Sequence, residues 1–165
     1  IRVNGINRFS AQGDIRLLDI IEQLGCRVES GPNYLEVTGR DLAAGELTLD
    51  LGDMPDMVPT VGVLAAFREG TTKIINVAHL RIKESNRLAA MVAQLNRIGI
   101  KASELADGLI IEGGKPHGAD IETYNDHRIA MSFAVAGLVT PGIVIRDKKC
   151  VDKSFPEFWR ELEKI

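Results

Sequence analysis

The stretch PDMVPTVGVLAAFREGTTKIINVAHLRIKES, residues 55–85, has a counterpart in NDHRIAMSFAVAGLVTPGIVIRDKKCVDKSF, residues 125–155. The alignment places Asp56 with Asp126 and Lys83 with Lys153, and the two pairs have the same separation along the chain. Each stretch reads as an Asp, an almost wholly apolar helix, a turn, a short β-branched strand and a loop that ends in Lys. Regular spacing of this kind predicts a structural unit that occurs more than once in the fold.

A second, looser match extends the repeat. IRLLDIIEQLGCRVE, residues 15–29, resembles NRLAAMVAQLNRIGIKASE, residues 86–104, and the separation of Arg16 from Arg87 is nearly that of the first two pairs. Each of these stretches reads as an amphipathic helix followed by a strand. The chain therefore reads as half a unit, one whole unit and another half unit.

The expected elements follow from periodicity and turn residues. The apolar period predicts an amphipathic helix over residues 14–25 that ends at Gly25. Two helices that are apolar on nearly all sides, which is typical of buried helices, are expected over residues 57–68 and 128–138. Two strand pairs are expected, at residues 26–29 with 34–38 and at 100–104 with 109–113. The predicted unit is strand, buried helix, strand, amphipathic helix and two further strands.

The predicted fold class is α/β (α+β), built from repeated βαβαββ units with buried helices, and residues 1–165 are expected to form a single domain. The chain is 45% hydrophobic and 26% charged, an ordinary globular balance. A net charge of −3 argues against nucleic-acid partners and against an acidic membrane surface. No apolar stretch is long enough to span a bilayer. With only two cysteines, a reducing, cytoplasmic location is the simpler expectation.

The segment HLRIKESNRL, residues 79–88, crowds three cationic side chains and one carboxylate together. The apolar period that follows predicts a helix start near Ser85, which is a good cap residue. Lys83 and Glu84 then lie just before the first turn, where free N–H groups favour an anion. Arg87 lies within that turn and opposes the helix dipole by about 0.3–1 kcal/mol, a penalty that an anionic ligand would reverse. On spacing alone, a solvated charged surface and an anion site with its own acid are both open.

Two acidic residues, Asp56 and Asp126, each precede a predicted buried helix. The simplest interpretation is that both cap their helices, and the functional alternative is a carboxylate that serves as a base at the mouth of a cleft. Cations recur at predicted helix N-termini at four positions, Lys83, Arg87, Arg128 and Lys153. Four such cations at equivalent positions of the repeat are hard to explain as ordinary solvated surface charges, and they favour an anion site.

The three histidines, His79, His117 and His127, have no spacing that resembles a zinc motif, so we expect no metal. A lone histidine is more often structural than catalytic. Cys150 lies near cations but is expected to be an inert thiol. The GG of IEGGK follows a strand without opening a helix, so it indicates a turn and not a phosphate-binding loop.

The segments PDMVPT, HLRIKESNRL, YNDHRIAM and CVDKSFPEFW, in this order and at these separations, resemble the 5-enolpyruvylshikimate-3-phosphate (EPSP) synthase family. HLRIKESNRL together with NDHRIAM is highly specific, and the resemblance covers essentially the whole chain. It implies an inside-out α/β barrel enolpyruvyltransferase fold, in which each of two lobes holds three βαβαββ units. On this basis the chain is the C-terminal part of such a protein and most of one lobe, and the N-terminal half of the full-length protein lies outside it.

The resemblance implies transfer of the enolpyruvyl group of phosphoenolpyruvate to the 5-hydroxyl of shikimate 3-phosphate, with release of phosphate. This is a step of the shikimate pathway of aromatic amino-acid biosynthesis, and it proceeds by addition and elimination without a metal or an organic cofactor. Asp56 would accept the hydroxyl proton and touch the shikimate ring, and Glu84 would give a proton to carbon. Lys83 and His79 would lie against shikimate 3-phosphate. The phosphate and carboxylate of phosphoenolpyruvate would be held by Arg87, Arg128 and Lys153.

Glu84 presents a physical problem, because its cationic neighbours favour the ionised form while an acid must hold a proton. We expect it to be protonated chiefly in the loaded site. Two alternative interpretations are the related enolpyruvyltransferase that acts on UDP-N-acetylglucosamine and a non-catalytic anion-binding domain. The missing N-terminal lobe would complete the cleft, so we expect residues 1–165 not to turn over alone.

Overall fold

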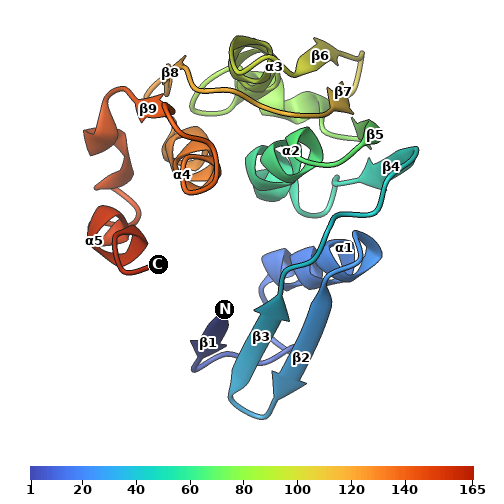
Figure 1. Cartoon of the computed structure of the whole chain (residues 1–165), viewed down its shortest axis with the longest axis vertical. Coiled ribbons are helices and arrows are strands. Elements are labelled where there is room, and N and C mark those ends of the chain that lie inside the picture. Colours follow the sequence, from blue (N-terminus) through green and yellow to red (C-terminus); the bar gives the residue numbers. More distant parts are fainter.

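The central part of the chain forms one complete βαβαββ unit in the computed structural model, which describes residues 1–165 (Figure 1). A 3-10 turn η2 (Pro55–Met57) leads into the first helix of the unit, and a second one, η3 (Ala78–Ile82), follows its second strand. In chain order the unit contains β4 (Leu47–Asp50), α2 (Val58–Ala66), β5 (Gly70–Ile75), α3 (Arg87–Arg97), β6 (Lys101–Glu104) and β7 (Leu109–Gly113). This order confirms the predicted unit.

The four strands of the unit make one sheet in the order β4-β5-β7-β6. β4 and β5 run parallel, while the other two pairs are antiparallel. A parallel pair needs a crossover connection, and α2 supplies it. Along β5, Thr72 and Ile74 are buried while Lys73 between them is exposed, as the alternating pleat of a strand requires. The inward face of the sheet therefore packs against the helices.

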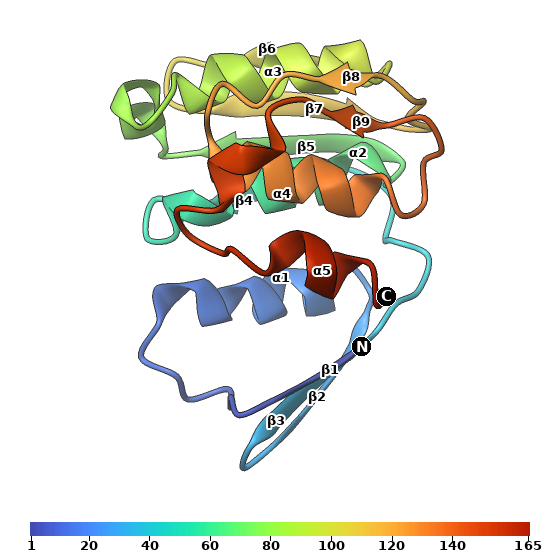
Figure 2. The same cartoon turned by 90° about the vertical axis from the view of Figure 1, so that its left-hand side faces the viewer.

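Two inner helices, α2 and α4 (His127–Ala136), lie next to each other (Figures 1 and 2). Their hydroxyl groups on Thr60 and Ser132 come within 3.4 Å of each other. The prediction of a buried helix is confirmed for α2, nearly all of whose residues are buried. It is only partly right for α4, because Val135 is 50% exposed. That side chain lines an apolar groove between the two helices, together with Met57 and Leu64.

Half units flank the central unit on both sides, as the repeat predicts. The first consists of η1 (Gly13–Arg16), α1 (Leu17–Gln23), β2 (Arg27–Gly31) and β3 (Tyr34–Thr38). β1 (Arg2–Asn4) adds to the free edge of β3 and completes a three-stranded antiparallel sheet. The last half unit consists of β8 (Asp120–Ile121), α4, β9 (Val144–Ile145), η4 (Lys148–Val151) and α5 (Phe158–Leu162). β8 and β9 run parallel, as β4 and β5 do.

The turns after β5 and β9 both contain a residue with positive φ. Asn76 directly follows β5 with φ +63°, and Asp147, the second residue after β9, has φ +45°. Asn and Asp are the residues other than glycine that enter this left-handed region most readily. Each of the two turns leads into a 3-10 segment that carries the chain toward the site. The 3-10 segments begin at Ala78 and at Lys148, in the register that pairs Lys83 with Lys153, so the repeat is one of structure and not only of composition.

One continuous apolar cluster of 32 buried residues joins the three parts of the chain, from Ile20 and Leu24 on α1 to Phe158 on α5. Residues far apart in the sequence therefore share one core. No helix in the structure combines the length and the apolar character that crossing a bilayer requires.

A buried arginine ties the first half unit to the central one. The Arg68 guanidinium donates to the carbonyl oxygens of Ala43 and Gly45, both at 3.0 Å, and to Thr72 Oγ1 at 2.8 Å. All these acceptors are neutral, and burial lowers the pKa of Arg68. No sequence motif indicates this residue, because two of its partners, Ala43 and Gly45, lie on a connection with no regular structure.

Candidate active site

Six polar side chains from three separate segments line a pocket of about 180 Å³ that contains no apolar residue. They come from η2, from the loop and first turn of α3, and from the first turn of α4: Asp56, Lys83, Glu84, Arg87, His127 and Arg128. Lys153 reaches the same place, because its Nζ lies 3.4 Å from Glu84 Oε1. The structure therefore brings together every residue proposed for the site from the sequence except His79. That histidine is exposed on η3 and does not line the pocket. The prediction that Lys153 lies at a helix N-terminus is wrong, since it follows η4 and the next helix, α5, begins only at Phe158.

The N-terminus of α3 begins one residue later than predicted. Asn86 is the cap, and its side-chain oxygen accepts a hydrogen bond from the Ala89 backbone N–H at 3.2 Å. The prediction that Ser85 caps this helix is wrong. Ser85 Oγ instead lies 3.2 Å from Asp126 Oδ2, because the chain turns the hydroxyl toward α4 and away from its own helix. Arg87 is the first residue of α3 and so lies in its first turn, as predicted.

Arg87 is the centre of the ion-pair network, and its side chain is only 2% exposed. Nε donates to Asp126 Oδ2 and Nη1 donates to Asp56 Oδ1, both at 2.9 Å. Nη2 reaches Glu84 Oε2 at 3.3 Å. Burial acts to lower the pKa of Arg87, but the bonds to Asp126 and Asp56 outweigh it and raise that pKa above its ordinary value. The protein's own carboxylates thus offset the unfavourable interaction of a cation with the helix N-terminus. The sequence had suggested this role for an anionic ligand.

Asp126 has the capping role predicted for it. Its Oδ1 accepts a hydrogen bond from the Arg128 backbone N–H at 3.0 Å at the start of α4. Its Oδ2 pairs with Arg87, and the carboxylate is fully buried. A buried charge persists only when it is paired and hydrogen-bonded, as this one is. Asp126 therefore fixes the start of α4 against the start of α3.

Asp56 does not cap α2, so the prediction of a cap is wrong here. It lies in η2, and no side chain caps either η2 or α2. The carboxylate instead pairs with Arg87 Nη1 at 2.9 Å and with Arg128 Nη2 at 3.0 Å. Partial burial by itself would raise the pKa of Asp56, but the charges of Arg128, Arg87 and Lys83 outweigh it and hold that pKa below its usual value. The Asp56 carboxylate therefore sits in the pocket as an anion.

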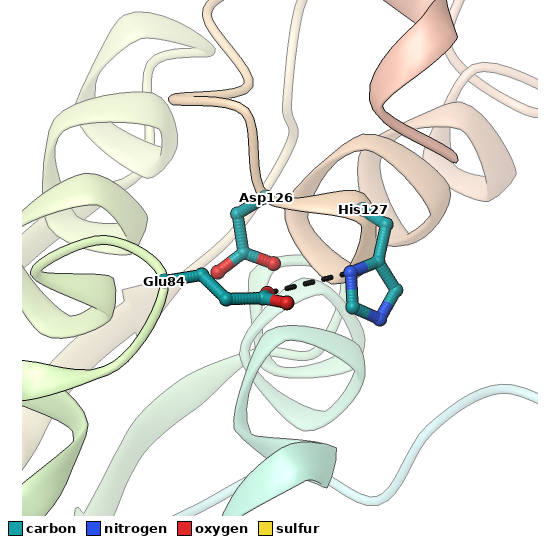
Figure 3. A group of neighbouring side chains, drawn as sticks. All are labelled: Glu84, Asp126 and His127. Carbon is teal, nitrogen blue, oxygen red and sulfur yellow. Dashed lines mark ion pairs between the residues drawn. The ribbon is translucent and has the colours of Figure 1, made fainter. Parts of the chain in front are cut away.

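The Glu84 carboxylate is surrounded by cations at longer distances. Oε2 lies 3.3 Å from Arg87 Nη2 and 3.3 Å from His127 Nδ1, and Oε1 lies 3.4 Å from Lys153 Nζ. Figure 3 shows Glu84 between Asp126 and His127, with its oxygens directed toward the histidine ring. The side chain is 40% exposed, so a ligand can reach it.

The two lysines are placed by different means. Lys153 Nζ donates to the Asn125 carbonyl oxygen at 3.2 Å, and that carbonyl belongs to an unusual turn in which both Tyr124 and Asn125 have positive φ, +53° and +56°. Strained backbone of this kind is concentrated at functional sites. Lys83 lines the pocket without an ion pair of its own. It is therefore free to meet an anionic ligand.

The arrangement suits an anion far better than a metal cation. Ligand atoms of Glu84, Asp126 and His127 lie within 4.8 Å of one another. However, both oxygens of Asp126 are already engaged by Arg87, by the Arg128 N–H and by Ser85. Four permanent cations surround the group, and they would repel a divalent ion. The pocket gathers cations and helix N-termini, an arrangement that suits an anionic ligand.

His127 is a site residue that no sequence pattern had singled out. It was expected to be structural because it stands alone, without a metal-binding or catalytic spacing. Its side chain is 13% exposed, and it lines the pocket beside Glu84. The only signal available in the sequence was its position next to Arg128 in NDHR, at the start of a buried helix.

Comparisons with known proteins agree with this geometry. The family model for EPSP synthase (3-phosphoshikimate 1-carboxyvinyltransferase) matches residues 1–162. The 3-phosphoshikimate 1-carboxyvinyltransferase of Trichormus variabilis is 46% identical over all 165 residues, and that of Syntrophobacter fumaroxidans is 50% identical over 161 residues. The chain spans about 38% of the length of the first relative and 37% of the second.

Solved structures show the same fold. EPSP synthase from Acinetobacter baumannii superimposes with a TM-score of 0.79 at 32% identity, over 99% of this chain and 40% of that one. The enolpyruvyl transferase NikO from Streptomyces tendae superimposes with a TM-score of 0.71 at 20% identity, over 99% of this chain and 38% of that one, which shows a shared fold only. The fold is thus the inside-out α/β fold of the enolpyruvyltransferases, and the chain belongs to the EPSP synthase family.

Proposed function

We propose that residues 1–165 form most of one lobe of a two-lobed enzyme that transfers the enolpyruvyl group of phosphoenolpyruvate to the 5-hydroxyl of shikimate 3-phosphate and releases phosphate. The single observation that carries this proposal is the convergence of Asp56, Glu84, the cations at the starts of α3 and α4, and Lys153 on one polar pocket. Family membership supports the same reaction. The relatives are more than twice as long as this chain, which supports a second lobe.

The charges of the pocket fit the two substrates, each of which carries both a phosphate and a carboxylate. Bidentate guanidinium groups match phosphate and carboxylate oxygens better than ammonium groups do. We assign the phosphate and carboxylate of phosphoenolpyruvate to Arg87, Arg128 and Lys153. Lys83, which has no ion pair of its own, is assigned to shikimate 3-phosphate, with His79 near the shikimate ring at the outer edge. Fixed cations of this kind stabilise charge that develops in the transition state.

The two carboxylates that face the pocket take opposite roles. In the addition step Asp56 accepts the proton of the 5-hydroxyl, whose oxygen forms a bond to the carbon that bears the phosphate, while Glu84 gives a proton to the methylene carbon. In the elimination step the methyl group returns a proton to Glu84, and the carbon–oxygen bond to phosphate breaks. Asp56 is ionised in the pocket, as an acceptor must be, but its lowered pKa makes it a weak base. Substrate anions that draw Arg87 and Arg128 away from Asp56 would make it a stronger one.

One lobe presents this pocket open on one side, and catalysis of this type needs water excluded. The test is a phosphate-release assay with both substrates, run on residues 1–165 and on the full-length protein that contains them. We expect turnover from the full-length protein only. Turnover by residues 1–165 alone would refute the need for a second lobe, and no turnover by the full-length protein would refute the transferase assignment.

The same assay distinguishes the other interpretations. Replacing shikimate 3-phosphate by UDP-N-acetylglucosamine should abolish phosphate release, and release with that acceptor would identify the related enolpyruvyltransferase. Calorimetric titration with phosphoenolpyruvate addresses the non-catalytic alternative. Binding without turnover by the full-length protein would favour an anion-binding domain.

A further inference from the structure

Of the three carboxylates at the site, Glu84 is the one held most loosely. Asp126 and Asp56 each make two charge-assisted contacts of 2.9–3.0 Å. The three contacts of Glu84 are 3.3–3.4 Å, longer than the roughly 2.7–2.9 Å of a strong bond between charged groups. A carboxylate with only long contacts loses little when it turns or takes up a proton. Glu84 is therefore the carboxylate of the three that its neighbours constrain least.

One of these long contacts involves a nitrogen that has no other partner. His127 Nδ1 is buried and makes no hydrogen bond, yet it lies 3.3 Å from Glu84 Oε2 (Figure 3). A buried polar atom left without a partner costs about 1–3 kcal/mol. A small rotation of the Glu84 carboxyl would satisfy it, whether Nδ1 donates to a carboxylate or accepts from a protonated carboxyl. The ring's other nitrogen points away from Glu84.

The charged groups around this pair come from every element that packs against it. The carboxylates of Asp56 and Asp126 are engaged by arginine, and the cations are Lys83, Arg87, Arg128 and Lys153. Lysine and arginine side chains ordinarily keep their protons near neutral pH. Histidine is the residue type that ordinarily gains and loses a proton in this range. Among the groups in contact with Glu84, only His127 is of this type.

We propose that His127 is a positioning residue that supplies Glu84 with its proton, and that the two side chains share one proton across the Nδ1–Oε2 contact. The proton leaves Nδ1 of the imidazolium and bonds to Oε2 of the carboxylate, which leaves a neutral imidazole and a neutral carboxyl group. The reverse transfer restores the ion pair. His127 needs no contact with the substrate for this role. The inference rests on the acid role assigned to Glu84 under the proposed function.

The surrounding cations act on the two side chains in opposite senses. They favour an ionised Glu84, but they also repel a positive charge on His127. Moving the proton from His127 to Glu84 loses the first effect and relieves the second, so the two effects of the cations offset each other. This arrangement allows a carboxyl group to hold a proton in a cationic pocket, the difficulty that the sequence had raised for Glu84.

A spectroscopic test does not depend on transferase activity. The imidazole nitrogen resonances of His127 are followed against pH by NMR in the full-length protein and in its Glu84→Gln variant. We expect the titration midpoint of His127 to move to lower pH in Glu84→Gln, because the contacting anion is lost. The exposed His79 is the matched control and should not move. An unchanged midpoint for His127 would overturn the proposal.

A kinetic test separates proton supply from mere packing. Asparagine at position 127 can place an amide near the Nδ1 position and bond to Glu84, but it cannot carry an exchangeable proton in this pH range. We expect His127→Asn to lower kcat by at least about tenfold and to change the pH profile of kcat, with the KM for phosphoenolpyruvate nearly unchanged. Wild-type kcat and pH profile in His127→Asn would overturn the proposal. If the proposed function itself were wrong, no variant would turn over, while the spectroscopic coupling could still be measured.

Discussion

Arg87 donates its Nε hydrogen to Asp126 Oδ2 at 2.9 Å, and both side chains are buried, 2% and 0% exposed. The two residues begin successive helices, α3 and α4, and stand 39 positions apart. A single guanidinium thus fixes the distance between two helix starts, and the remaining donors of Arg87 hold the two pocket carboxylates, Asp56 and Glu84. The ion pair is the structural base on which the candidate active site is built.

Replacing Arg87 by Met is expected to destabilise the fold by roughly 3–5 kcal/mol, because it leaves the buried charge of Asp126 without its partner. Urea unfolding measures the change. The control is Arg146→Met, which breaks an exposed pair with Asp120 and should destabilise the fold far less, because solvent screens such a pair. If the two variants lost the same free energy of unfolding, the buried pair would contribute no more to stability than the exposed pair does.

The stability of the fold should depend on the ionisation of Asp56. Because its pKa is held below the usual value, ionised Asp56 contributes stability above the ordinary carboxyl value of about 3.9. That contribution is lost as the pH falls through the lower pKa of the folded state. The difference in unfolding free energy between wild type and Asp56→Asn should therefore be largest near neutral pH and shrink toward pH 3. A difference that does not vary with pH would contradict this.

Glu84→Gln is expected to lower kcat of the full-length protein by about 10²–10⁴, since it removes the proposed proton donor. The KM for phosphoenolpyruvate should change little, because the loss falls on the transition state. The matched control is Glu112→Gln, a change at an exposed glutamate on β7 that pairs with Lys101. A Glu84→Gln enzyme with wild-type kcat would remove Glu84 from the mechanism.

Arg128→Lys keeps the positive charge and removes the planar fork of donors. If Arg128 holds the phosphate or carboxylate of phosphoenolpyruvate, the KM for that substrate should rise by about tenfold or more, equivalent to about 1.4 kcal/mol or more. Arg97→Lys on α3, which lies outside the pocket, should leave the KM unchanged. Steady-state phosphate release gives both values, and similar KM values in the two variants would rule out this role for Arg128.

Two adjacent glycines offer a matched pair for the packing of the sheet against α2. A Cβ on Gly113 would stand 2.1 Å from the Arg68 carbonyl oxygen and 2.2 Å from that of Ala65, whereas a Cβ on Gly114 would meet no atom within 4 Å. Gly113→Ala should therefore cost about 1–3 kcal/mol by overpacking, and Gly114→Ala much less. Thermal or urea unfolding compares the two variants. If both are tolerated, the end of α2 does not pack against β7 as closely as the structure shows.

Local patterns were sufficient to predict the order of helices and strands and their repeat. The separation of Asp56 from Asp126, which equals that of Lys83 from Lys153, predicts the repeat. The helical and alternating periods of the apolar residues distinguish the helices from the strands around them. The strand pairs β2 with β3 and β6 with β7 lie where the turn residues place them. These features depend on regular spacing along the chain, so a sequence without an alignment can reveal them.

Predictions about single side chains at the helix starts were less successful. Ser85 and Asp56 are both plausible caps by residue type, but Asn86 caps α3 and Asp56 turns to two arginines. A local rule identifies candidates for a cap and does not weigh a nearby charge from another segment. Arg68 was missed for the same reason, because its partners Ala43 and Gly45 have no distinctive pattern.

The amino-acid sequence by itself determined which segments form helices and strands, that they repeat, and that cations gather at helix starts, because each of these depends on spacing along the chain. Only the tertiary structure decided that Arg87 is shared between the equivalent carboxylates of two repeat units and that His127 lies against Glu84. Those contacts arise where α2, α3 and α4 bring their first turns together. The energy of such a contact depends on distance and burial, which no spacing along the chain encodes.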